Sequence, residues 1–160
     1  MDNNMGNIYF ENIFNQDLEL IREWLSRHYL SRWFGRRKDW IYEIKNKKGE
    51  FNYIKHFIIK NENEKIGFCQ YYDYYYAQED WYKTDEHNKI YSIQYIIGNE
   101  DYSNKYYGKE IVKILVEKIK EINGFLIIIK PEPERKIINQ ILKETGFKYN
   151  NEKEYYYMKL

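Results

Sequence analysis

Apolar and polar residues follow each other along the chain in two patterns, one typical of strands and one typical of helices. The clearest helix is amphipathic, with apolar side chains at three- and four-residue spacing from Ile111 to Ile122, and Asn123 and Gly124 end it. Asn15 is expected to be the N-cap of the first helix. The other expected elements are strands at 6–13, 51–60, 65–76, 90–97 and 125–129, helices at 39–50 and from Pro131 to Gly146, and two last strands around Asn150.

This order of elements predicts an α/β fold in which helices flank a central mixed sheet, built as one domain over residues 1–160. A βαβ crossover, a strand followed by a helix and a parallel strand, is centred on residues 98–129. Ligands of such sheets bind at the carboxyl ends of strands, where helix N-termini present free backbone N–H groups. The turn at 101–108 is therefore the expected anion site.

Composition narrows the possible partners. The chain has 26 Lys and Arg against 25 Asp and Glu, and a formal charge of +1 argues against recruitment by nucleic acid or by a membrane. The single cysteine, Cys69, excludes an internal disulfide, and its apolar surroundings predict a buried thiol. The three histidines share no metal-ligand spacing, so no metal is expected. Without a secretion signal or a run of ~18–20 apolar residues, we expect a soluble, cytoplasmic protein.

The turn before the long helix carries residues suited to a diphosphate. Such a cradle needs consecutive amides that face one anion, with cations close by. Lys105 and Lys109 supply the cations, and Gly108 allows a close backbone approach. The same spacing also fits an ordinary strand-to-helix connection with surface lysines.

The chain resembles the GNAT superfamily of acetyl-CoA-dependent N-acetyltransferases, and most closely its aminoglycoside 6′-N-acetyltransferase branch. Where that branch has Gly-Lys-Gly-x-Gly-(Thr/Lys)-x-x-Val, residues 104–112 read Asn-Lys-Tyr-Tyr-Gly-Lys-Glu-Ile-Val. Further similar segments, in the same order, are Glu-Trp-Leu-Ser-Arg at 23–27, Trp-Phe-Gly at 33–35, Ile-Gly-Phe-Cys-Gln-Tyr-Tyr at 66–72, Trp-Tyr at 81–82 and Thr-Gly-Phe at 145–147.

The resemblance implies a GNAT-like acyl-CoA N-acyltransferase fold with acetyl-CoA as acyl donor and a small-molecule primary amine as acceptor. The donor would lie between the strands at 90–97 and 125–129, where backbone groups of Ile96 and Ile97 orient the thioester. The pyrophosphate would be held by Ser103, Asn104, Lys105, Tyr106, Tyr107, Gly108 and Lys109. Whether the protein is a monomer or a homodimer stays open.

The sequence departs from the family pattern where the chemistry is expected. Tyr106 replaces the first loop glycine, and Gln94 replaces an Asp base but cannot accept a proton at neutral pH. The other departures are Ser103 for Arg or Gln, Lys130 for an acidic residue, Leu142 for a tyrosine acid and Arg135 for an Asn. These changes disfavour a polycationic aminoglycoside as acceptor. A degenerate module that binds CoA or another ligand without turnover is the alternative function.

Other residues offer substitute chemistry. The candidate catalytic residues are Gln94, which would contact the amine, Tyr95 as a proton donor and Glu100 as a base through water. Tyr106, Tyr107 and Asp101 offer the same groups, and the sequence favours packed tyrosines and solvated loop acids over catalytic roles for all of these. The expected acceptor wall holds carboxylates beside aromatic faces, which attract an ammonium group. Its residues are Asp80, Trp81, Tyr82 and Asp85, with Trp33 and Phe34 opposite.

Overall fold

The structure is a computed structural model that describes residues 7–27, 37–130 and 136–160. Trp33 and Phe34, expected in the acceptor wall, lie outside the described residues, and so does Arg135. None of the helices in the described ranges is long and apolar enough to cross a membrane.

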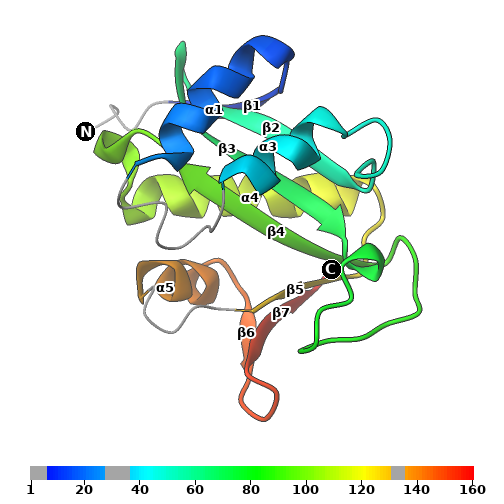
Figure 1. Cartoon of the computed structure of the whole chain (residues 1–160). Coiled ribbons are helices and arrows are strands. Elements are labelled where there is room, and N and C mark those ends of the chain that lie inside the picture. Colours follow the sequence, from blue (N-terminus) through cyan, green and yellow to red (C-terminus); the bar gives the residue numbers. More distant parts are fainter. Residues whose placement is uncertain (1–6, 28–36, 131–135) are drawn as a thin grey trace. The chain divides into compact units, whose positions relative to one another are not determined.

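A mixed seven-stranded sheet in the order β1-β2-β3-β4-β5-β7-β6 forms the framework (Figure 1). Its strands are β1 (Ile8–Asn12), β2 (Ile54–Asn61), β3 (Glu64–Asp73), β4 (Ile90–Ile97), β5 (Leu126–Ile129), β6 (Lys148–Asn150) and β7 (Tyr155–Lys159). The described helices are α1 (Leu18–Leu25), α3 (Arg37–Lys45), α4 (Lys105–Glu121) and α5 (Lys136–Glu144). The predicted α/β class and element order are confirmed.

The predicted βαβ crossover is also confirmed. β5 runs parallel to β4, with Ile90 opposite Leu126 and Tyr91 opposite Ile127. On its other side β5 pairs antiparallel with β7, which makes the sheet mixed. The helix between β4 and β5 is α4, and the connection at 98–104 leads from the carboxyl end of β4 to its N-terminus.

The chain forms two compact units, each with its own apolar core. The first unit contains residues 1–70 and 95–103, and the second contains residues 71–94 and 104–160. In the first unit α1 and α3 pack on the sheet through a cluster of Ile13, Leu18, Ile21, Trp24, Leu25, Ile41, Ile44, Ile58, Phe68 and Ile96. In the second unit the buried side chains of α4 are Tyr107, Ile111, Val112, Leu115, Val116 and Ile119.

Several predicted boundaries are wrong, and local hydrogen bonds explain them. α1 begins at Leu18 after a short 3-10 turn at Asn15–Asp17, so Asn15 is not its N-cap. The Asp17 carboxylate accepts instead from the Phe14 backbone N–H at 2.8 Å and from Lys65 Nζ at 2.6 Å. The Asp17 carboxylate therefore provides the hydrogen-bond acceptor for the Phe14 N–H, three residues earlier in the chain.

The ends of other elements also move. α3 stops at Lys45 rather than near Gly49, because Asn46 accepts two turn hydrogen bonds through its backbone carbonyl, from the N–H groups of Gly49 and Phe51. β2 accordingly starts at Ile54, and β3 ends at Asp73, because residues 74–76 form a 3-10 turn. Ile122 is 43% exposed although it was expected on the buried face of the helix, because α4 ends at Glu121.

Candidate functional site

The expected anion loop is shorter than the sequence predicts because α4 begins early. A 3-10 turn at Glu100–Tyr102 follows β4, and Asn104 is the N-cap of α4, with its side chain accepting from the Tyr107 N–H at 3.2 Å. Lys105 to Lys109 are consequently helical. Backbone N–H groups in the first turn of a helix point outward along the positive end of its dipole, so this N-terminus suits an anion.

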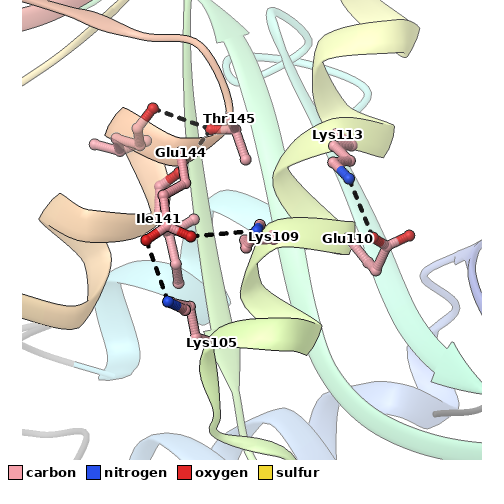
Figure 2. Close-up of polar contacts among 8 residues, drawn as sticks. Lys105, Lys109, Glu110, Lys113, Ile141, Glu144 and Thr145 are labelled. Carbon is pink, nitrogen blue, oxygen red and sulfur yellow. Dashed lines mark hydrogen bonds and ion pairs between the residues drawn. The ribbon is translucent and has the colours of Figure 1, made fainter. Parts of the chain in front are cut away.

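Two lysines of α4 converge on one carboxylate of α5. Glu144 Oε2 lies 3.1 Å from Lys105 Nζ, and Glu144 Oε1 lies 3.2 Å from Lys109 Nζ. Figure 2 shows the Glu144 carboxylate between the two ammonium groups, while Lys113 and Glu110 form a separate pair on α4. Hydrogen bonds from Lys105 and Lys109 lower the pKa of the Glu144 carboxyl below its usual value. The two cations expected at a diphosphate therefore lie together in the second unit, already sharing an anion.

The aromatic side chains at this N-terminus are packed. Tyr107 and Gly108 are buried, and Tyr106, which stands where the resembling family has glycine, is half-buried. The Tyr106 ring meets the Tyr107 ring edge-on, with centroids 5.2 Å apart. This contact gives the Tyr106 ring a packing role at the start of α4.

The carboxyl end of β4 is held closely within the first unit. The side chains of Ile96 and Ile97 are buried, with exposures of 1% and 8%. A Cβ atom on Gly67 of β3 would lie only 2.1 Å from the Ile96 carbonyl oxygen, so the two backbones approach each other very closely there. Gly98 N–H donates to the Ile66 carbonyl at 2.8 Å, which fixes the residue after the strand.

The ladder between β4 and β5 is short. Among the described residues it contains the pairs at Ile90 and Tyr91 only, although β4 continues to Ile97 and β5 continues to Ile129. Within the second unit, the part of β4 that carries half-buried Gln94 thus lies beyond the paired segment. Tyr95, the next residue, is also half-buried.

An acid that no sequence motif marks holds the connection from β4 to α4 in place. Glu64, at the start of β3, accepts from Asn99 Nδ2 at 2.7 Å and from the Tyr102 hydroxyl at 2.7 Å. Glu100 and Ser103 are exposed on the same connection. Glu64 is 35 and 38 residues from its partners, so no local pattern marks it.

The expected acceptor residues Trp81 and Tyr82 belong to an aromatic cluster of the second unit. Their rings lie 5.4 and 5.7 Å from the ring of Tyr74, which is fully buried. The Tyr74 hydroxyl donates to the Tyr82 carbonyl at 2.9 Å, and burial raises the pKa of Tyr74 to about 12. Trp81 and Tyr82 are both half-buried, and each keeps some exposed surface. Asp80 and Asp85 are exposed on either side of them.

In the described ranges, no three His, Cys, Asp or Glu side chains cluster closely enough to hold a metal ion.

Comparison with known proteins gives a family match and a set of similar structures. A family model described as "Acetyltransferase (GNAT) domain" matches residues 14–155. The crystal structure of the aminoglycoside acetyltransferase AAC(6')-Ib in complex with coenzyme A has a TM-score of 0.78 at 19% identity, covering 96% of this chain and 95% of that chain. An aminoglycoside N(6')acetyltransferase from Legionella pneumophila has a TM-score of 0.72 at 14% identity, covering 100% and 93%. A GNAT family acetyltransferase from Bacillus anthracis has a TM-score of 0.69 at 18% identity, covering 95% and 94%.

Proposed function

We propose that this chain, which belongs to the acetyltransferase (GNAT) domain family, transfers the acetyl group of acetyl-CoA to a primary amine on a small molecule. The observation that carries the proposal is the N-terminus of α4, where outward-facing amides and the ammonium groups of Lys105 and Lys109 come together. This arrangement fits a diphosphate, because helix N-termini and lysines both attract phosphate oxygens. The short β4–β5 ladder supports a donor that inserts beside β4.

The reaction is a direct transfer. The lone pair of a neutral amine attacks the thioester carbonyl carbon, a C–N bond forms and the C–S bond breaks. The sulfur leaves as a thiolate that takes up a proton, and the new ammonium nitrogen loses one. The protein needs to hold both reactants in contact and to polarise the carbonyl, and positioning alone supplies a large share of such rate enhancements.

Each chemical role falls to a side chain or backbone group in our proposal. Backbone groups of Ile96 and Ile97 orient the thioester, and Gln94 hydrogen-bonds the amine. Tyr95, whose phenol carries an O–H donor, is the proton donor to the thiolate. Glu100 is exposed and accepts the amine proton through water.

The acceptor is a small amine rather than a polycation. Structures similar to this chain contain kanamycin and ribostamycin with coenzyme A, which supports a small-molecule acceptor. Asp80 and Asp85 supply negative charge beside the partly exposed rings of Trp81 and Tyr82. Lys130, which follows β5 and donates to the Glu154 carbonyl at 3.1 Å, places a positive charge where the resembling branch has an acid. A single ammonium group is therefore the better match.

Two measurements test this function. Millimolar acetyl-CoA should raise the melting temperature, because a ligand that binds only the folded state stabilises it by mass action. Free thiol should then appear when a panel of mono- and diamines is added, at a rate that depends on the amine. No melting shift at millimolar acetyl-CoA, together with no thiol release, would overturn the proposal.

A second candidate function is favoured by Gln94 and Tyr106. Gln94 cannot act as a base, and Tyr106 places a ring at the diphosphate site. The chain would then hold CoA or a related nucleotide without turnover. A clear melting shift with acetyl-CoA, and no amine-dependent thiol release across the panel, would favour this binding function over catalysis.

A further inference from the structure

Two charges of the second unit have the wrong sign for the helix ends that carry them. The first turn of α4 contains Lys105 and no acidic residue, although carboxylates are the side chains that stabilise a helix N-terminus. Glu144 is the last residue of α5, where the helix dipole favours a cation. Local violations of this kind are expected where a residue serves a function rather than its own helix.

The Glu144 carboxylate contacts the lysines as a phosphate group would. Each of its two oxygens accepts from a different ammonium group, with N–O distances of 3.1 and 3.2 Å (Figure 2). Phosphates at charged sites are also held by separate donors that each bind a different oxygen of the same anion. The carboxylate therefore occupies a position suited to a phosphate oxygen pair.

The end of α5 keeps Glu144 at this position. The Thr145 hydroxyl donates to the Ile141 carbonyl at 2.8 Å and caps the last turn (Figure 2). Gly146 follows with a φ of 105°, a left-handed conformation that ends the helix at low cost. The backbone of Glu144 is thus fixed, while its side chain and both lysines are partly exposed, so solvent reaches all three.

We propose that Glu144 is an internal counter-anion of the diphosphate site and that the incoming diphosphate displaces it from Lys105 and Lys109. The inference rests on the proposed function for the identity of the donor, but its core is that these two lysines bind a diphosphate in competition with Glu144. Ion pairs between partly exposed side chains are weak, so a diphosphate with more charge can replace them. Glu144 thereby sets the affinity of the site, because every bound diphosphate must first break the two pairs.

The test compares E144Q with E110Q, a control on α4 that removes the carboxylate paired with Lys113 at 3.5 Å. Calorimetric titrations use two probes, inorganic diphosphate and CoA, at low and high salt. E144Q should bind each probe about threefold to tenfold more tightly than the parent at low salt, as expected for the loss of two weak competing pairs. The gain should shrink at high salt, and E110Q should stay within about twofold of the parent. In a K105Q/K109Q background, E144Q should produce no gain.

The outcomes distinguish a failure of this inference from a failure of the proposed function. Equal or weaker diphosphate binding by E144Q would overturn the inference, because Glu144 would then be neutral to the site or would organise it. Tighter diphosphate binding by E144Q, with no binding of CoA by any variant, would support the counter-anion and overturn acetyl-CoA as donor. Far-UV circular dichroism and melting of each variant confirm that the folded state is compared throughout.

Discussion

His56 is a buried residue whose polar atoms are poorly matched to their surroundings. It lies on β2 with 6% exposure, and neither ring nitrogen has a hydrogen-bond partner among the described residues. Burial, together with the charges of Lys47 and Lys55, lowers the pKa of His56 to about 4. The ring is therefore neutral at pH 7, and protonating it inside the fold is unfavourable.

This shift predicts a stability that falls in mild acid. Between pH 6.5 and 4 the unfolded chain binds a proton at His56 that the folded chain does not, so the free energy of unfolding decreases as the pH falls. The full effect is about 3 kcal/mol once the pH is below 4. Urea unfolding of the parent and of H56L from pH 7.5 to 4 measures it.

The leucine variant isolates the histidine from the carboxylates that titrate in the same range. H56L removes two unpaired polar atoms at similar volume, so it should match or exceed the parent in stability at pH 7. Its loss of stability toward pH 4 should be smaller than that of the parent. Parallel pH curves for the two proteins would contradict the assignment.

At the scale of the elements, the spacing between β3 and β4 depends on Gly67. The Ile96 carbonyl oxygen lies 2.1 Å from the position that a Cβ atom on Gly67 would take, and this obstacle is backbone rather than a movable side chain. Ile96 is the residue whose backbone we propose to orient the thioester. The strand spacing therefore links the stability of the first unit to the proposed catalytic geometry.

The substitution G67A should consequently harm both stability and activity. We expect a loss of about 2–3 kcal/mol in the free energy of unfolding, typical of overpacking a close contact. G49A is the matched control, because the nearest atom to its Cβ would be 3.9 Å away, and it should change stability by less than about 0.5 kcal/mol. Equal denaturant midpoints for G67A and the parent would show that the strands separate without cost.

Among the elements, the regular helices and strands were easier to predict from the sequence than the short turns. The apolar face of the long helix from Ile111 to Ile119 and the strand at 90–97 were predicted well, because their apolar spacing is regular over several turns or residues. The 3-10 turns at 15–17 and 74–76 were missed, because they depend on the side chains of Asp17 and Asp73 bonding backbone N–H groups.

Only part of the candidate site could be predicted from the sequence. Lys105 and Lys109 stand out in the sequence because they lie at the turn between a strand and the long helix, where an anion site is expected. Glu144 does not, because it comes from another helix 35 residues beyond Lys109 and has no motif of its own. Predicting the cations but not their counter-anion is the expected limit of reasoning from one sequence, since only the folded chain brings the three together.

For the whole molecule, the two compact units are interleaved along the chain. β3 and β4 each begin in one unit and end in the other, so neither unit is a continuous segment. Elements that share strands are expected to lose their structure together. We therefore expect the single-domain behaviour predicted from the sequence, with one cooperative unfolding transition.

Spectroscopy can test this cooperativity with W81F. Combined with W33F, that variant keeps only Trp24 and Trp40, which both belong to the first unit, so tryptophan fluorescence follows that unit alone. Far-UV circular dichroism at 222 nm follows the described helices of both units, including α4 and α5 of the second unit. The two signals should give the same urea midpoint. Separate midpoints would mean that the units unfold independently.

The burial of Cys69 has a practical consequence for measuring enzymatic turnover. It is the sole cysteine of the chain, and its side chain on β3 is 1% exposed, as the sequence analysis predicted. A chromogenic disulfide reagent reacts with accessible sulfhydryls, so the native protein should contribute almost no colour of its own. Any background colour in such an assay would come from unfolded molecules, in which the Cys69 thiol is accessible. The background measured before any reactant is added would therefore give the folded fraction of each preparation.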